Sequence, residues 1–328
     1  MMDSTGTEGA GRTCASATLV LRDLQAYASQ FPQLYGNNVF DAALLASLAH
    51  LTAFSCPWLA PKRQQIVGRA ALWTFGVDFA IDYQARSEEE VDSIVDRCTT
   101  AAAGAPPRRG DELMGAIAEI RDALTPFGCP ELLALWADGV SRSLDAQRRE
   151  WEWKTSRCVL PTLDEYIQNA DSANAMVVLV AEWILDDPVG AMHHRDALVP
   201  AARAFQTASL LLNDLGSRQR DEEWGDVNGF MLGVEAVAVT DRMRAAAREA
   251  DDALRPLRQL GLGPAEHAGR VLEFARGYYS FTDFWGELGH PAVRRRADRP
   301  STRAYDRPPG PAPGGTGRDY RSMGGELD

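Results

Sequence analysis

The sequence NDLGSRQRD at residues 213–221 is the stretch that most strongly indicates the fold class and the chemistry of this chain. Residues four apart share one face of an α-helix, so Asn213, Ser217 and Asp221 should lie in one row. Their amide, hydroxyl and carboxylate oxygens suit a hard cation such as Mg²⁺, which takes few protein ligands and fills its octahedron with water and phosphate. Arg220 beside them is suited to a phosphate group. The spacing predicts a helix that binds a metal ion and a phosphate.

The alternative interpretation of this stretch is a solvated helix face, on which Asn, Ser and Asp are common. However, the residues immediately before it, 201–212, are largely apolar. Polar groups are costly to bury without partners, so a polar row within an apolar helix usually has a buried purpose. The apolar residues before the stretch therefore favour the metal-binding interpretation.

The rest of the chain predicts an all-α fold. Apolar residues recur at helical spacing from residue 41 onward, and alternating runs of Val, Ile and Thr are nearly absent. Proline and glycine divide the chain into helices of ordinary length. Residues 17–291 are expected to form one helical domain, whereas the N-terminus (1–16) and the tail rich in Arg, Pro and Gly (292–328) are expected to be disordered.

The composition excludes several classes of protein. With 328 residues and 45% hydrophobic content, the chain can bury a large core. Its net charge of -12 argues against a nucleic-acid-binding protein, because phosphate backbones are bound by clustered Lys and Arg. No stretch approaches the roughly 20 apolar residues of a membrane helix. The five cysteines lack CxxC spacing, so neither a zinc site nor a disulfide framework is indicated, and a cytoplasmic location is expected.

The stretch at 213–221 resembles the second metal motif of bacterial class I terpene synthases, (N/D)Dxx(S/T)xx(K/R)(E/D). The residues that follow, 222–228, are also similar to the family's extension, and the whole resemblance covers roughly residues 43–285. It implies a single helical bundle around a central active-site cavity, a prenyl diphosphate substrate and three Mg²⁺ ions. The specified positions of the motif are met by Asn213, Asp214, Ser217, Arg220 and Asp221.

The family carries a further acidic motif, DDxx(D/E), on a facing helix upstream. The similar stretch here is DFAID at residues 78–82, in which Phe79 replaces the second aspartate, a position that often points away from the metal ions. The alternative is a helix end that enters a charged loop, with both aspartates solvated. Asp78 and Asp82 would share one face. The resemblance thus implies five metal ligands: Asp78, Asp82, Asn213, Ser217 and Asp221.

The segment between the motifs departs from many bacterial members of the family. There, an arginine that senses the diphosphate follows a tyrosine by four or five residues, but Ala170 and Asp171 stand at those places after Tyr166. The diphosphate would then be bound by the other cations of the region: Arg220, Arg157 and Lys154.

Two stretches resemble labdane-related diterpene synthases of the ent-kaurene, atiserene and terpentetriene type. YIQNADS at residues 166–172 is similar to their Y-x-x-N-A-x-x-S segment, and residues 274–284 are similar to their late helix A-R-x-x-x-x-F-Y-x-x-T-D-G-F. Such enzymes start from an already cyclised, copalyl-type diphosphate. Since no DxDD motif is present, a separate class II diterpene cyclase would supply that substrate.

The implied reaction leaves a carbocation that needs a dry cavity with aromatic faces, each of which stabilises a cation by about 0.5 to 2 kcal/mol. It would end by loss of a proton or capture of water. An aromatic residue at helical spacing is more often plain core, so about half of the aromatic candidates are expected there. The expected cavity residues are Trp73, Phe75, Phe79, Tyr166, Asn169, Ser172, Trp183, Tyr278, Phe281 and Phe284.

Other functions stay open. The chain could act directly on farnesyl or geranylgeranyl diphosphate. A chain-elongating prenyltransferase shares the fold but should carry two full DDxxD motifs, and only one broken copy occurs. A non-catalytic helical scaffold is a further alternative, because Phe79 and the absent arginine weaken the site. The sequence leaves monomer and homodimer equally open.

Overall fold

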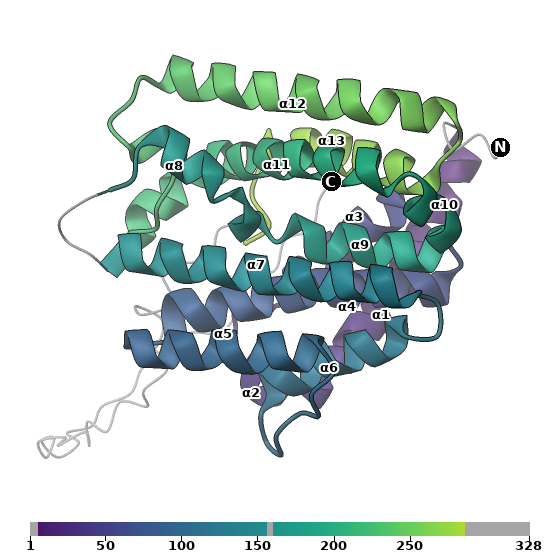
Figure 1. Cartoon of the computed structure of the whole chain (residues 1–328), viewed down its shortest axis with the longest axis horizontal. Coiled ribbons are helices and arrows are strands. Elements are labelled where there is room, and N and C mark those ends of the chain that lie inside the picture. Colours follow the sequence, from purple (N-terminus) through teal and green to yellow (C-terminus); the bar gives the residue numbers. More distant parts are fainter. Residues whose placement is uncertain (1–5, 156–159, 286–328) are drawn as a thin grey trace, which may run out of the picture. The chain divides into compact units, whose positions relative to one another are not determined.

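The computed structural model describes residues 6–155 and 160–285 (Figure 1). Every regular element in these two ranges is a helix, which confirms the predicted all-α fold. None of the described helices is long and apolar enough to cross a membrane. The α-helices are α1 (Thr7–Gln30), α2 (Pro32–Tyr35), α3 (Ala42–Ser55), α4 (Pro61–Phe79), α5 (Glu88–Ala102), α6 (Glu112–Leu124), α7 (Pro130–Thr155), α8 (Leu163–Gln168), α9 (Ala175–Asp186), α10 (Pro188–His193), α11 (Arg195–Trp224), α12 (Ala236–Gln259) and α13 (Gly263–Tyr279). The short 3-10 or π-helical segments are η1 (Ala80–Gln84), η2 (Ala170–Ala173) and η3 (Gly229–Met231).

Helix α1 corrects the predicted disorder of residues 1–16, because it begins at Thr7. One side of α1 packs on α3 and α4, and this burial orders the helix. The polar side chains of its first turns hide the helical period from a prediction based on composition. Residues 1–5 and 292–328, also expected to be disordered, lie outside the described residues. The buried stripe of α1 consists of Gly9, Thr13, Ala17, Val20, Leu24 and Tyr27.

The helices that matter for function surround a central cavity. Helix α9 packs against α4, α7, α11 and α13, while α3 packs against α4 and α13. Helix α12 covers α11 and α13, whereas α5 and α6 pack on α7 and α4 at the opposite side of the view in Figure 1. The cavity wall therefore combines helices from both halves of the sequence.

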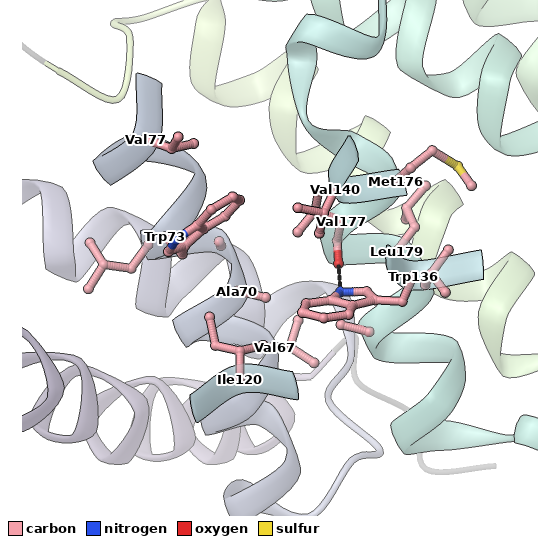
Figure 2. Packing of buried hydrophobic residues seen from close by; sticks show 14 of the residues in the cluster. Val67, Ala70, Trp73, Val77, Ile120, Trp136, Val140, Met176, Val177 and Leu179 are labelled. Carbon is pink, nitrogen blue, oxygen red and sulfur yellow. Dashed lines mark hydrogen bonds between the residues drawn. The ribbon is translucent and has the colours of Figure 1, made fainter. Parts of the chain in front are cut away.

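Two buried tryptophans, Trp73 of α4 and Trp136 of α7, form hydrogen bonds to the neighbouring helices α6 and α9 (Figure 2). The indole Nε1 of Trp136 donates to the carbonyl oxygen of Val177 at 3.0 Å, and that of Trp73 donates to Leu113 at 3.3 Å. Each ring thus satisfies its single donor while it buries a large apolar surface. Trp73 belongs to this interhelical core and not to the cavity wall, so its predicted place in the cavity is wrong.

A break in the helical path before α9 brings polar residues to the cavity. Helix α8 starts with a capping box, in which Thr162 and Glu165 each accept a hydrogen bond from the other's backbone N–H. Segment η2 is then followed by its C-cap, Asn174, whose φ of 57° is left-handed, a conformation that asparagine tolerates better than most residues. Ser172 and Asn174 line the cavity as a result of this break.

Candidate active site

The central cavity has a polar part and an apolar part. Such a division suits a ligand with a charged group attached to a hydrocarbon. The polar part is lined by Asp78, Asp82, Tyr83, Glu150, Lys154, Asn213, Asp214, Arg220, Asp221 and Asp226. The apolar wall includes Leu48, Val67, Ala71, Phe75, Val178, Leu179, Phe205, Val271, Phe284 and Trp285.

Asp78 and Asp82 lie at the C-terminal end of α4 and in the π-helical turn η1 that continues it. Both carboxylates line the cavity. Burial, reinforced by the nearby carboxylate of Asp226, raises the pKa of Asp78 to about 7. Burial and the charge of Asp78 likewise raise the pKa of Asp82. Arg220 and Lys154 oppose the shift at Asp78, but burial and the neighbouring carboxylates outweigh them.

Phe79, which stands where the resembled motif has its second aspartate, lies away from the cavity. It is buried in an aromatic cluster, with its ring centroid 5.7 Å from that of Phe40 and 5.5 Å from that of Tyr83. Its predicted place on the cavity wall is therefore wrong. A carboxylate at this position would be surrounded by apolar rings, so the replacement removes no oxygen ligand from the cavity.

Asn213, Ser217 and Asp221 form the expected row on α11. Asn213 and Asp221 line the cavity, and Ser217 is fully buried beside them. The Ser217 hydroxyl lies 2.5 Å from Oδ2 of Asp221 and 2.9 Å from the carbonyl oxygen of Asn213. The amide nitrogen of Asn213 donates to the Tyr279 hydroxyl at 2.9 Å, and that of Asn228 donates to Asp221 at 2.8 Å. These bonds hold the row in place, and the amide oxygen of Asn213 has one long contact, with the Ser217 hydroxyl at 3.4 Å.

Asp214, the next residue of the same motif, turns both carboxylate oxygens toward protein donors. Oδ1 accepts from the Tyr166 hydroxyl and Oδ2 from the backbone N–H of Gly229, each at 3.0 Å. Burial raises the pKa of Asp214 to about 8. Asp214 therefore connects α11 with α8 and η3, whereas its neighbour Asn213 faces the cavity row.

Lys154, in the last turn of α7, lies among the carboxylates of the cavity. Its Nζ is 2.5 Å from Oδ1 of Asp226 and donates to the backbone carbonyl of Asp82 at 3.1 Å. Nζ also lies 4.2 Å from the centre of the Tyr83 ring, and the Tyr83 hydroxyl donates to Asp226. One ammonium group thus links α7, η1 and the segment after α11.

Arg220 provides a second cation, on α11 in the stretch 213–221. Its guanidinium forms ion pairs with Asp221 and with Asp283, both at 2.7 Å, and lies over the Trp224 ring. The side chain lines the cavity. Arg157, the third cation expected here, lies outside the described residues.

Asp171, at the place of the absent arginine, contacts the scaffold and does not line the cavity. It forms an ion pair with Arg142 of α7 and accepts from the amide nitrogen of Gln206 at 2.6 Å. Gln206 in turn accepts from the backbone N–H of Met176 at the start of α9. Where the resembled enzymes place a sensor of diphosphate, this chain places a junction between helices.

Four of the expected cavity residues line the cavity: Phe75, Tyr166, Ser172 and Phe284. Two more are buried elsewhere, which corrects their prediction. Asn169 is buried outside the cavity, and its amide nitrogen donates to the carbonyl oxygen of Ala146 at 2.9 Å. Trp183 is 1% exposed in the core on α9.

The predictions for Tyr278 and Phe281 are also wrong. Tyr278 stacks on Phe284 at 4.5 Å and its hydroxyl is hydrogen-bonded to Ser47, so the next residue, Tyr279, lines the cavity instead. Phe281 follows the end of α13 and is 96% exposed within the described structure. Aromatic residues one position apart on a helix face different directions, and their identity does not reveal which one faces the cavity.

The polar residues of the cavity wall that the sequence did not predict include Tyr83, Glu150, Asp226 and Tyr279. Glu150 lies one helical turn before Lys154, so the spacing of four could have revealed it. It accepts from the Ser172 hydroxyl at 2.8 Å, and burial raises its pKa. Asp226 lies in the extension that follows the second motif, but no spacing marks it as a partner of Lys154.

The donors in the polar part of the cavity fit Mg²⁺ better than a metal held by protein alone. Among the described residues, no three His, Cys, Asp or Glu side chains converge closely enough to hold an ion. Two separate faces of carboxylate, amide and hydroxyl oxygen suit Mg²⁺, which completes its shell with water and phosphate. Burial raises the pKa of both Asp78 and Asp82, so a bound cation would favour the charged forms of these carboxylates.

Two comparisons of the sequence with known proteins agree with this geometry. The family model "Terpene synthase family 2, C-terminal metal binding" matches residues 69–238, just over half of the chain, and this range contains both acidic stretches. Ent-pimara-9(11),15-diene synthase from Streptomyces sp. strain KO-3988 is 28% identical over 279 residues, which are 82% of this chain and 92% of that protein.

Solved structures share the helical fold. Linalool/nerolidol synthase from Streptomyces clavuligerus, in complex with 2-fluorogeranyl diphosphate, has a TM-score of 0.63 and 15% identity, and the match covers 81% of this chain and 93% of that chain. A cucumene synthase variant has a TM-score of 0.61 and 15% identity, with 82% and 95% covered. At this identity the likeness establishes the fold alone.

Proposed function

Because the chain belongs to terpene synthase family 2 and is a class I terpene synthase, we propose that it converts a bicyclic, copalyl-type diphosphate into a diterpene. The observation that carries the proposal is one cavity in which the acidic groups of α4, η1 and α11 adjoin an apolar, aromatic wall. Similarity to a diterpene synthase along 92% of that enzyme supports the substrate class. Tyr166 and Ser172 of the labdane-type segment, which line the cavity, support it further.

The polar part of the cavity would bind the diphosphate. Bound Mg²⁺, three ions in this proposal, supplies positive charge that offsets the charge developing on the departing diphosphate. Lys154 and Arg220 would turn part of their hydrogen-bonding capacity from Asp226 and Asp283 to the diphosphate oxygens, with Arg157 as a third cation. The proposed ligands of the ions are Asp78, Asp82, Asn213, Ser217 and Asp221.

The apolar part of the cavity would hold the carbocation. Phe75 lies 5.9 Å from Phe284 and 5.2 Å from Trp285, measured between ring centroids, and all three line the cavity. Their faces stabilise a cation by about 0.5 to 2 kcal/mol each, and the apolar surroundings exclude water until the final step. That step would be proton loss or capture of water, and diphosphate would be released.

The substrate class is tested by incubating the purified protein with Mg²⁺ and, separately, farnesyl, geranylgeranyl and copalyl diphosphate. Products are then analysed by gas chromatography with mass spectrometry. We expect a diterpene from copalyl diphosphate alone, in which case a class II cyclase must supply the substrate. A cyclic product from geranylgeranyl or farnesyl diphosphate would contradict the bicyclic substrate. Absence of product from all three would contradict the proposed function.

A further inference from the structure

His267 lies on the cavity wall, far from the acidic groups that would bind the diphosphate. It shares one face of α13 with Val271, Ala275 and Tyr279, all of which line the cavity. Tyr279 is hydrogen-bonded to Asn213 of the polar row. His267 precedes Tyr279 by about three turns, or ~18 Å along the helix axis. The histidine therefore belongs to the apolar end of the cavity.

A buried carboxylate lies directly behind His267. Glu182 of α9 is fully buried and His267 is 1% exposed, and Nδ1 of His267 is 3.4 Å from Oε2 of Glu182. Within the described structure, neither carboxylate oxygen of Glu182 nor Nδ1 of His267 has a hydrogen-bond partner of ordinary geometry. Burial raises the pKa of Glu182, and the histidine acts in the opposite direction. His267 is thus the neighbour that favours the charged form of Glu182, whereas Asp186 disfavours it.

The hydroxyl groups on the neighbouring part of the wall are already engaged. Thr52 and Ser55 of α3, which packs on α13, donate to the backbone carbonyls of Leu48 and Thr52 at 2.8 and 3.2 Å. Neither is a base at neutral pH. Of the Asp, Glu, Lys, Arg and His side chains that line the described cavity, His267 is the one outside the polar part.

A purely structural role explains this arrangement poorly. A buried ionisable pair pays a large desolvation cost, and apolar residues of similar volume often stabilise a core as well or better. A tie between α9 and α13 also requires no basic group on the wall of a hydrocarbon-binding cavity. A carboxylate behind a histidine is instead the arrangement that fixes one tautomer, with Nδ1–H toward the carboxylate and a free lone pair on Nε2.

We propose that Nε2 of His267 accepts the proton that ends the carbocation reaction, and that Glu182 is the positioning residue behind it. This inference rests on the proposed function. The C–H bond beside the cationic carbon breaks, and its electron pair becomes the π bond of the new alkene. The proton moves to Nε2, and the resulting imidazolium pairs with the Glu182 carboxylate. When the product leaves, the imidazolium gives this proton to water, which restores the neutral imidazole.

The test uses His267→Asn, because asparagine can still donate to Glu182 but has no basic nitrogen. Release of inorganic diphosphate and the product profile are measured on the prenyl diphosphate that the unaltered enzyme converts. We expect diphosphate release to stay within about 3-fold, because ionisation occurs at the other end of the cavity. The main alkene should fall at least 10-fold as a share of products, in favour of alkenes deprotonated elsewhere or of alcohols.

Two further variants keep the test decisive. His50→Asn makes the same change on an exposed histidine of α3 and should leave the product profile unchanged. Glu182→Gln retains an acceptor for Nδ1–H but loses the charge, so this variant should shift the product profile in the same direction as His267→Asn, but by less. Glu182→Asp keeps the charge and should restore part of the profile of the unaltered enzyme. Circular dichroism shows whether each variant is folded.

An unchanged product profile in folded His267→Asn would overturn the role of the histidine. A profile changed in His267→Asn but unaffected in both Glu182 variants would overturn the role of Glu182. If the unaltered enzyme released no diphosphate from any prenyl diphosphate, the proposed function itself would fail, and the two failures are thereby distinguished.

Discussion

Asn213 and Asp214 are adjacent polar residues of one motif, and their surroundings give them different roles. Both oxygens of Asp214 accept hydrogen bonds from the scaffold, through Tyr166 and Gly229. Asn213 donates its amide nitrogen to Tyr279, and its amide oxygen faces the row, where the Ser217 hydroxyl lies 3.4 Å away. The spacing of four predicted that Asn213, Ser217 and Asp221 share a face, because helical geometry alone decides it. It could not predict the partners of Asp214, which come from distant segments.

At the residue scale, the metal-ligand assignment predicts that Asp78→Asn and Asn213→Ala each lower Mg²⁺-dependent release of diphosphate by about 100-fold or more. The physical reason is that each substitution removes one oxygen ligand from an acidic face that offers few such ligands. Release is measured with a coupled phosphate assay, and helicity by circular dichroism. Asp164→Asn, at an exposed carboxylate of α8, is the matched control and should keep full activity. Full activity in both site variants would refute the assignment.

Lys154 allows a second prediction at this scale. If it binds diphosphate in place of the absent arginine, Lys154→Met should raise KM about 10-fold, which corresponds to ~1.4 kcal/mol of binding. Lys154→Arg keeps the charge and should recover much of the loss. Steady-state kinetics measure both. A KM for Lys154→Met equal to that of the unaltered enzyme would exclude this role.

At the scale of elements, the approach of α13 to α11 depends on Gly216. A Cβ atom at this position would lie 2.6 Å from Cδ1 of Tyr279, so the tyrosine would have to move away from Asn213. We expect Gly216→Ala to destabilise the fold by about 1 to 3 kcal/mol in chemical denaturation.

The matched control for Gly216 is Gly277, also helical, where a Cβ atom would meet nothing within 4 Å. Gly277→Ala should stabilise the protein by about 0.4 to 1 kcal/mol, because alanine restricts the unfolded chain. Equal effects of the two substitutions would show that the close approach of Tyr279 is unimportant.

The helices themselves could largely be predicted from the sequence, but the wall of the cavity could not. Trp73 and Phe75 are apolar neighbours on α4, and the helical period marks both as buried without showing that only Phe75 lines the cavity. The same limit applies to Tyr278 and Tyr279. The interior of this protein contains both a packed core and a cavity, and local sequence does not distinguish them. The first part of helix α1, up to residue 16, was predicted to be disordered because its polar turns resemble a disordered terminus.

At the scale of the whole molecule, the site is assembled from parts that are distant in sequence. Asp82 of η1, Lys154 of α7 and Asp226 after α11 meet only because α4, α7 and α11 pack around one cavity. The junction made by Asp171 replaces a cation that many related enzymes place near the diphosphate. Among the described residues, Lys154 and Arg220 are the lysine and arginine that line the cavity, and the proposed function therefore assigns diphosphate binding to them.

The most direct test of the central claim is thermal unfolding of the protein with Mg²⁺, with inorganic diphosphate, and with both together. A ligand that binds only the folded state at 100 times its Kd adds about 2.7 kcal/mol of stability. We predict that the midpoint rises by several degrees only when both are present, and that Asp78→Asn and Asn213→Ala each abolish most of this rise. An equal rise with either component alone, or an undiminished rise in both variants, would contradict the claim that the two acidic faces bind metal and diphosphate jointly.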